Sequence, residues 1–339
     1  MFRVKILFRV ARALRAASWI SRSETTTAQL AGLEESFMNC ARLLANVSRR
    51  GALTMLSVLL IGGAWPGVAS ASTALNVITW NIRIDDSSES HARTTMDLLL
   101  ATTPQPEVIV IEEAYQQWFS TYIDELQQRT GRTWQGVFAT HCAPNNWTGS
   151  ACSTPWYQGI GIFTTHAITS SNSTLFPFAD CWTSARVGLR AAIDVGGTTV
   201  QVFAMHLQTG SCTDVRQARF NSMSQLKAWA ANYSGPQIVA GDFNADMDQI
   251  DTTQGMLPNF LDSWPIVGSG NGFTALIPGP TMKLDYWFSD SGGGAVPTST
   301  AVVTATGSVS DHYPVQATFV IQSVGPPSAP KGLRITPTP

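Results

Sequence analysis

Residues 237–244 read Gln-Ile-Val-Ala-Gly-Asp-Phe-Asn, an apolar run that ends abruptly in polar residues. The run 237–240 has the length and the β-branched content of a buried strand. Alternate side chains of an extended chain point the same way, so Asp242 and Asn244 should face one side and Phe243 the core. A buried strand has no packing reason to end in a carboxylate. This strand end is therefore a candidate functional site.

Polar residues stand at the ends of other apolar runs in the same way. Three runs in the first half of the chain each end in a polar residue, and runs in the second half begin with one. These positions are Asn81, Glu112-Glu113 and His206 in the first half, and Asp285 and Asp311-His312 in the second. Antiparallel pairing would bring both sets to one rim of the protein.

Such a rim would hold several carboxylates at short range. Those of Glu113, Asp242, Asp285 and Asp311 would repel one another, and burying them without compensation would be costly or would force protonation. A hard cation relieves this cost. Oxygen ligands without cysteine suit Mg²⁺, Mn²⁺ or Ca²⁺ better than zinc. The sequence therefore predicts a divalent-metal site.

The wider pattern predicts a layered α/β domain. Helical stretches are expected at 91–101, 116–128 and 215–231. Strand-like runs lie at 75–80, 108–111, 159–163, 187–195, 199–205, 237–240, 284–288, 301–305 and 314–321. Gly196-Gly197 joins two of these runs with a two-residue hairpin signal, so the strand pairing is at least partly antiparallel.

Six segments resemble, in order, the motifs of the endonuclease/exonuclease/phosphatase superfamily, the deoxyribonuclease I-like group. They read TWNI at 79–82, PEVIVIEE at 106–113, MHL at 205–207, GDFN at 241–244, LDY at 284–286 and SDHYPV at 310–315. The resemblance covers about residues 75–320. It implies a four-layered α/β sandwich with two central mixed, largely antiparallel β-sheets and outer helices. It also implies metal-assisted attack of water on phosphorus.

The resemblance further implies a role for each matched residue. The metal ligands would be Asn81, Glu113 and Asp311. The catalytic residues would be His206, Asp242, Asn244, Asp285 and His312, with Asp285 orienting His312 as a general acid or base and His206 contacting the phosphate or aiding proton transfer. Glu112 stands where the family commonly has Gln, so the choice between Glu112 and Glu113 as a ligand rests on register.

Two arginines and three histidines fall outside these motifs. Arg186 and Arg190 lie on the run before the hairpin, where they either bind substrate phosphate or form surface ion pairs. His91, His141 and His166 match no motif and are assigned structural roles.

The two ends of the chain differ from its middle. Residues 1–71 have the layout of a leader with a secretory signal, because Arg49-Arg50 precedes an apolar stretch and small residues follow at 68–71. That stretch is shorter than the ~20 residues of a membrane span, so a secreted or extracytoplasmic protein without a transmembrane span is expected. Residues before about 38 would be an overextended translation start. The catalytic domain would cover 72–322, and the proline-rich tail 323–339 is either disordered or the start of a fibronectin type III module.

The charge and the cysteine content of the chain bear on its expected partners and on its redox environment. From Ser72 onward twelve basic and twenty acidic residues remain, a net charge near −8 with only three lysines. Phosphate-neutralising nucleic-acid binders usually display clustered basic residues. Four cysteines in an exported chain suggest disulfides. A local bridge between Cys142 and Cys152 would leave Cys181 with Cys212, but three pairings are open, as are free buried thiols.

Three functions fit these observations. The first is a secreted, divalent-metal-dependent phosphoesterase that hydrolyses phosphodiester bonds as a deoxyribonuclease I-like nuclease. The second is a phosphatase or phospholipase acting on inositol phosphates or sphingomyelin. The third is a catalytically silent binding module. The expected partner is a phosphodiester or phosphomonoester substrate, which includes nucleic acid under the first hypothesis, and the expected state is a monomer.

Overall fold

The computed structural model describes residues 72–83, 86–141, 157–176, 186–210, 214–246, 255–276 and 281–322. The chain divides into a unit Met1–Val68 and a unit Ala69–Pro339, and every described residue belongs to the second. The expected leader, the expected tail and all cysteines of the expected disulfides lie outside the described residues. Among the described helices, none has the length and apolar character needed to cross a membrane.

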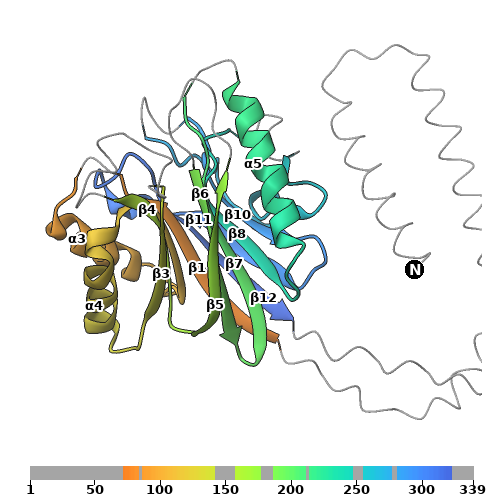
Figure 1. The fold of residues 1–339 in the computed structure, drawn as a ribbon. Coiled ribbons are helices and arrows are strands. Elements are labelled where there is room, and N and C mark those ends of the chain that lie inside the picture. Colours follow the sequence, from red (N-terminus) through yellow and green to blue (C-terminus); the bar gives the residue numbers. More distant parts are fainter. Residues whose placement is uncertain are drawn as a thin grey trace, which may run out of the picture. The chain divides into compact units, whose positions relative to one another are not determined.

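Two six-stranded β-sheets lie at the centre of the domain (Figure 1). The strands are β1 (Ser72–Asn81), β2 (Val108–Tyr115), β3 (Gln135–Thr140), β4 (Gln158–Thr164), β5 (Ala167–Phe176), β6 (Arg186–Val195), β7 (Thr198–His206), β8 (Gln237–Asp242), β9 (Phe260–Asp262), β10 (Asp285–Asp290), β11 (Ala295–Val302) and β12 (Val315–Gln322). Sheet A has the order β11-β12-β1-β2-β4-β3, and sheet B has the order β5-β6-β7-β8-β10-β9.

Most neighbouring strands are antiparallel. Among the described strands, only β1 with β2 and β7 with β8 pair in parallel. The hairpin expected at Gly196-Gly197 joins β6 to β7, and both glycines have positive φ, at 61° and 86°. A mixed, largely antiparallel pair of sheets is thus confirmed.

Alternating side chains divide the core into three apolar layers. On β1, Leu75 and Val77 pack between the sheets, whereas Ile78 and Trp80 pack on the outer face of sheet A. Helices α3 (Glu89–Leu100) and α4 (Phe119–Thr130) cover that face, and α5 (Val215–Ala230) covers sheet B (Figure 1). Fully burying such a side chain contributes roughly 1.5–3 kcal/mol. The layer order helix, sheet, sheet, helix confirms the predicted sandwich.

Local predictions were right where a periodic apolar pattern was present. All three expected helices form, although 116–118 is a short 3₁₀ helix, η1 (Gln116–Trp118), ahead of α4. The strand expected at 301–305 was wrong, because β11 ends at Val302 and Thr304–Thr306 forms a 3₁₀ helix, η3. Strands β3, β5 and β9 were missed. β5 is a mostly exposed edge strand rich in Ser and Thr, so it carries no apolar alternation.

Candidate active site

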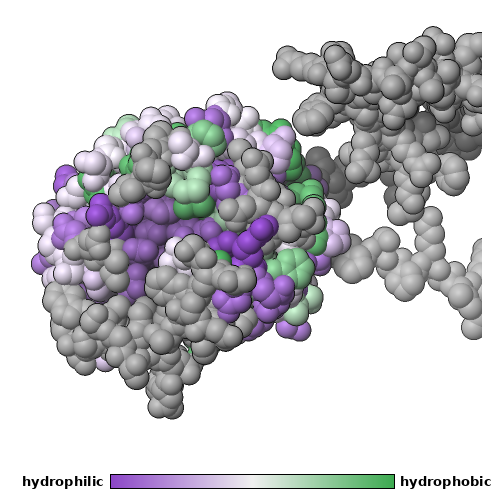
Figure 2. Space-filling model, turned by 90° about the horizontal axis from the view of Figure 1, so that it is seen from above, coloured by the Kyte–Doolittle hydropathy of each residue, from purple (hydrophilic) through white to green (hydrophobic). Residues whose placement is uncertain are grey.

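The polar strand ends lie together at one end of the two sheets. Parallel β7 and β8 and antiparallel β10 place His206, Asp242 and Asp285 at adjacent positions across sheet B. In sheet A, parallel β1 and β2 end together at Asn81 and Glu112. Figure 2 looks down on this end of the domain, where hydrophilic residues surround a hollow. The predicted rim is therefore present, and both sheets contribute to it.

The two neighbouring glutamates of β2 have different surroundings. The register of β2 against β4 shifts between Ile111 and Ala114, and within this bulge Glu113 has a φ of 57°. The side chain of Glu113 reaches the rim, where its Oε1 accepts a hydrogen bond from Asn81 Nδ2 at 3.3 Å. A non-glycine residue at positive φ costs roughly 1–3 kcal/mol, and such strain clusters at functional sites. The bulge therefore turns Glu113 toward the site.

Glu112, in contrast, is fully buried. Its Oε1 accepts a hydrogen bond from Thr79 Oγ1 at 2.9 Å, and its Oε2 has no hydrogen-bond partner among the described residues. Burial, reinforced by the carboxylates of Asp285 and Asp242, raises the pKa of Glu112 well above its ordinary value. The raised pKa favours the protonated, neutral form of Glu112, which is compatible with the glutamine that the family commonly has there.

We expect Glu113→Gln and Glu112→Gln to have very different effects on metal binding and on the rate of hydrolysis. Loss of the Glu113 carboxylate should weaken divalent-metal affinity by more than roughly 100-fold, since even residues behind the metal ligands cost 10–100-fold. Glu112→Gln replaces a carboxyl whose raised pKa favours its neutral form by a neutral amide, and it should change the rate by less than roughly tenfold. The measurement is the Mg²⁺ dependence of phosphodiester hydrolysis. The reverse pattern would assign the metal to Glu112.

Asp242 is the central carboxylate of the rim. It is 1% exposed and accepts hydrogen bonds from Asn81 Nδ2 at 3.0 Å and from Asn244 N at 2.7 Å. Asn244 Nδ2 lies 3.2 Å from Asp242 Oδ2 and Phe243 is fully buried in the core, so the sides expected for these residues are confirmed. The cause differs from the prediction, because β8 ends at Asp242 and Asn244 has a φ of 50° instead of continuing an extended strand. Burial, with a further contribution from Asp285, raises the pKa of Asp242 to about 7.

Gly241 lets β7 and β8 approach each other beside Asp242. Its φ is 135°, and a Cβ at this position would lie 1.8 Å from the carbonyl oxygen of Met205. We expect Gly241→Ala to lower the free energy of unfolding by more than the roughly 1–3 kcal/mol of a strained backbone, because a backbone clash is added. Urea titration measures this, and Gly197→Ala is the control, since φ is also positive there but the Cβ meets nothing within 4 Å. Equal losses in both variants would contradict the close approach.

His312 and Asp285 form a hydrogen-bonded pair. His312 Nδ1 lies 2.8 Å from Asp285 Oδ2, and Thr274 Oγ1 accepts a hydrogen bond from the backbone N of Asp285. The carbonyl oxygen of His312 accepts a hydrogen bond from Trp80 Nε1. Burial alone would lower the pKa of His312, but Asp285 and Asp242 outweigh it and raise that pKa to about 10. His312 is therefore an imidazolium at neutral pH, held by Asp285.

His206 stands on the other side of Asp242 and is neutral. Its Nδ1 lies 3.3 Å from Arg186 Nη1, and its Nε2 lies 3.5 Å from Asp242 Oδ2 and 3.9 Å from Glu113 Oε1. Burial lowers the pKa of His206 well below its ordinary value, and the charge of Arg186 adds to this. Because Arg186 can only donate, His206 Nδ1 accepts, and the ring proton is on Nε2, facing the carboxylates.

The remaining predicted residues divide into those at the rim and those away from it. Asp311 adjoins Asn81, because Ser310 Oγ donates to the Asn81 carbonyl oxygen at 2.6 Å and lies 3.5 Å from Asp311 Oδ1. Arg190 lies away from the rim, opposite Phe203 in the middle of β7. Its guanidinium bonds to other side chains and covers the ring of Tyr233. The bonded side chains are Asn172, Gln201 and Ser170. The structure therefore places Arg190 away from the rim, among neutral side chains.

Two sets of side chains could hold a cation. Asp242, Asp285 and His312 offer ligand atoms that lie within 4.8 Å of one another. The His312–Asp285 hydrogen bond already uses one atom of each of these two residues. These atoms would have to give up that bond to bind a metal, so this set fits a cation less well.

The second set consists of the carboxylates of Glu113 and Asp311 and the amide oxygen of Asn81. That oxygen accepts a hydrogen bond from Arg83 N and keeps a second lone pair. Carboxylate and amide oxygens without a thiolate suit a hard divalent cation. Asn81 also contacts Asp242, whose pKa is raised by burial and by the carboxylate of Asp285 in spite of the nearby His312 imidazolium. A cation beside Asn81 and Glu113 would offset the repulsion among the buried carboxylates of the rim. The residues present therefore fit a divalent metal.

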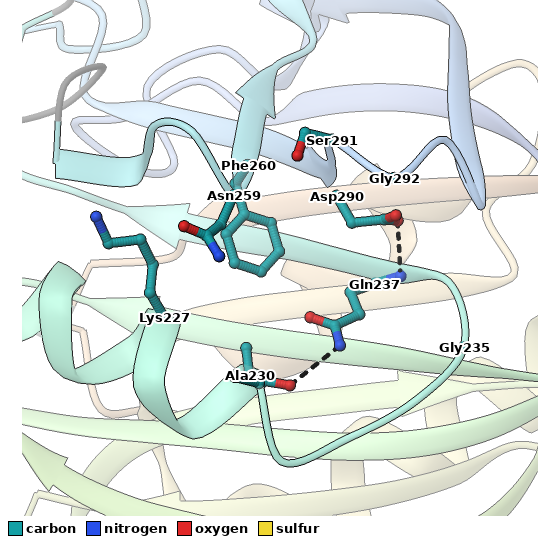
Figure 3. Close-up of a pocket in the computed structure, with 10 residues that line it drawn as sticks. Lys227, Ala230, Gly235, Gln237, Asn259, Phe260, Asp290, Ser291 and Gly292 are labelled. Carbon is teal, nitrogen blue, oxygen red and sulfur yellow. Dashed lines mark hydrogen bonds between the residues drawn. The ribbon is translucent and has the colours of Figure 1, made fainter. Parts of the chain in front are cut away.

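A separate pocket, with a volume of about 240 Å³, lies at the opposite end of sheet B (Figure 3). It is lined at the start of β8 by Gln237 and at the end of β10 by Asp290. Gln237 N donates to Asp290 Oδ1, and Gln237 Nε2 donates to the carbonyl oxygen of Ala230. These polar groups satisfy one another, so Gln237 and Asp290 have structural partners in this pocket.

A two-sheet sandwich with carboxylates, amides and two histidines at one rim has the groups that hydrolysis of a phosphoester needs. A model of the Endonuclease/Exonuclease/phosphatase family matches residues 78–312, and the chain belongs to this family. Members of this family are hydrolases that act on phosphoesters. A comparison with curated proteins found no match.

Solved structures share the fold at low identity. An endonuclease/exonuclease/phosphatase family protein from Bacteroides thetaiotaomicron is 14% identical with a TM-score of 0.59, covering 74% of this chain and 99% of its own. The human nocturnin catalytic domain is 18% identical with a TM-score of 0.56, covering 75% and 96%. Sphingomyelinase C from Streptomyces griseocarneus is 18% identical with a TM-score of 0.57, covering 73% and 99%.

Proposed function

We propose that this chain is a secreted, divalent-metal-dependent phosphodiesterase of the deoxyribonuclease I-like kind, with DNA as its substrate. The observation that carries this is the position of Asp242. It bonds to Asn81 on the side of the predicted metal and lies 3.5 Å and 3.9 Å from the Nε2 atoms of His206 and His312. A carboxylate between a cation and two histidines is placed to act on a water that attacks phosphorus.

Each residue of the site has its own role in the proposed reaction. A bound cation supplies positive charge that offsets the charge developing on the phosphate. Asp242, whose pKa of about 7 suits a general base near neutral pH, orients the attacking water and accepts its proton. The imidazolium of His312 donates a proton to the leaving oxygen. His206, whose ring proton is on Nε2, donates a hydrogen bond to a non-bridging phosphate oxygen, and Asn244 holds Asp242 in position.

A second candidate substrate is a phosphorylated headgroup, such as that of sphingomyelin or an inositol phosphate. The near −8 charge from Ser72 onward and the scarcity of lysine favour it, because a protein that tracks a nucleic-acid backbone needs many basic contacts. The shared fold with a sphingomyelinase C is compatible with this candidate.

A panel of substrates decides between these candidates. The purified protein with Mg²⁺ is incubated with plasmid DNA, sphingomyelin and inositol phosphates, each with an EDTA control. Nicking of plasmid with Mg²⁺ alone supports the nuclease. Release of phosphocholine or inorganic phosphate without nicking selects the headgroup enzyme. No metal-dependent hydrolysis of any substrate would instead support a silent binding module.

Export is part of the proposal and rests on the leader at 1–71. We expect expression in a secreting bacterial host to release a protein whose N-terminus begins near Ser72. N-terminal sequencing of the protein in the medium checks this. A protein retained in the cytoplasm with its leader intact would contradict export.

A further inference from the structure

His141 belongs to no motif of the chain, yet it lies beside the site. It follows β3 directly and is 0% exposed, and its backbone N donates to the Gln158 carbonyl oxygen at 3.0 Å. Its ring meets that of His206 edge to face, with 5.8 Å between the ring centroids. A histidine that is assigned a structural role by sequence is thus in contact with the histidine that faces Asp242 and Glu113.

The hydrogen bonds of His141 fix where its ring proton is. Val187 N donates to His141 Nδ1 at 3.2 Å, so Nδ1 carries no proton. Burial, together with the charge of Arg186, lowers the pKa of His141 well below its ordinary value, so the ring is neutral. The proton is therefore on Nε2. That atom is buried and has no hydrogen-bond partner among the described residues.

An unsatisfied buried donor costs roughly 1–3 kcal/mol, and each such group in a native protein calls for a reason. His141 is well held on its other side by Val187 N and by packing on His206. Its Nε2–H is therefore a rigid donor that lacks an acceptor next to the candidate active site.

Arg186, the residue before Val187, is a second buried group that an anion would stabilise. Its side chain is buried, with 6% of the residue exposed, and it bonds through Nε to Gln208 Oε1 and through Nη1 to His206 Nδ1, both neutral groups. The carboxylates of Glu113 and Asp242 favour the charged form of Arg186, but burial outweighs them and lowers its pKa. A buried guanidinium is costly, and an anion that enters the site relieves that cost.

We propose that His141 and Arg186 form an anion subsite on the His206 side of the rim, in which His141 Nε2–H donates to an oxygen of the substrate phosphate. The Arg186 guanidinium neutralises the charge of the same group. The phosphate is then held on one side by His141, Arg186 and His206, and the His312–Asp285 pair handles the proton on the other. The inference rests on the proposed function, because that function identifies the anion as a phosphate ester.

The test compares two amide variants that reproduce different ring nitrogens. His141→Asn places an amide oxygen near the position of Nδ1 and keeps the acceptor for Val187 N, but it has no donor at the Nε2 position. His141→Gln places an amide N–H near Nε2. His166→Asn is the control, because its Nε2 is also buried without a hydrogen-bond partner but lies 3.7 Å from Glu107, at the other end of β2.

Binding of inorganic phosphate is measured by calorimetry in EDTA, and KM for a phosphodiester is measured with Mg²⁺. A hydrogen bond to a charged group contributes roughly 1.5–3 kcal/mol, so His141→Asn should weaken phosphate binding and raise KM by roughly 10–100-fold, with a smaller change in kcat. His141→Gln should recover most of the affinity, and His166→Asn should bind as the wild type does.

Wild-type affinity in folded His141→Asn, or equal losses in the Asn and Gln variants, would overturn the inference. If the variants do not fold, the ¹⁵N-edited imidazole spectrum of the wild type replaces them. The His141 Nε2–H signal should shift on phosphate saturation, and an unmoved signal overturns the inference. Since phosphate binding is measured without metal, binding without hydrolysis of any ester would refute the proposed function alone.

Discussion

Asp242→Asn is expected to lower kcat for metal-dependent phosphodiester hydrolysis by roughly 10²–10⁴-fold, the usual contribution of a general base. The amide keeps the size and most hydrogen bonds of Asp242 but cannot accept the proton of the attacking water. Asp242 contacts Asn81, and it is the one carboxylate of the described residues that lies within 4 Å of both histidines. Steady-state rates at saturating Mg²⁺ measure the effect.

The same variant should be more stable than the wild type when metal is removed. The pKa of Asp242 is raised from 3.8 to about 7 in the folded protein, so its unfolded form loses the proton first. Protonated Asp242 does not destabilise the folded protein, so its contribution to the free energy of unfolding is fully kept below pH 4. That contribution is lost as the pH rises through 7. Asp242→Asn should therefore gain roughly 1–4 kcal/mol at pH 8 in EDTA, measured by urea titration. A less stable, fully active variant would contradict both roles.

His312→Gln should also lower kcat, by roughly 10²–10⁴-fold, because the proton donor for the leaving oxygen is lost. The Asp285 and Asp242 carboxylates raise the pKa of His312 to about 10, which keeps it protonated at neutral pH. Wild-type activity should fall at alkaline pH as His312 loses its proton, and this decline should disappear in the variant. A pH–rate profile of both proteins, from pH 6 upward, measures the difference.

Asp285 supplies the control for this prediction, since it acts through His312. Asp285→Asn should reduce kcat on its own, but it should add little to His312→Gln in the double variant, because the two residues form one hydrogen-bonded unit. Losses that multiply would show that Asp285 acts independently of His312. An intact alkaline decline in His312→Gln would assign it to another group.

The sequence predicted the parts of the site that follow strand periodicity. The apolar run that ends at Asp242 was enough to predict that Asp242 and Asn244 lie on one side and Phe243 in the core, although Asn244 reaches that side through a positive φ beyond the end of β8. The fold class was also predictable, because three apolar layers leave their pattern in the strands and helices. The order of the six sequence motifs was enough to predict the family.

Features that depend on irregular backbone or on distant contacts were not predictable. The bulge that turns Glu113 to the rim leaves no periodic signal in the sequence. His141 gains its significance from a hydrogen bond to Val187, 46 residues away, between strands of different sheets. The surroundings of Arg190 were not predictable for the same reason, since Asn172, Gln201 and Ser170 meet its guanidinium only in the folded sheet.

The central claim is that this rim hydrolyses phosphodiesters with the help of a divalent cation. Its most direct test is the release of 4-nitrophenolate from bis(4-nitrophenyl) phosphate by the purified wild-type protein with Mg²⁺, after EDTA, and after Mg²⁺ is restored. We predict hydrolysis with Mg²⁺, its loss on chelation and its recovery on restoration. Equal rates in all three conditions, whether zero or not, would contradict the claim.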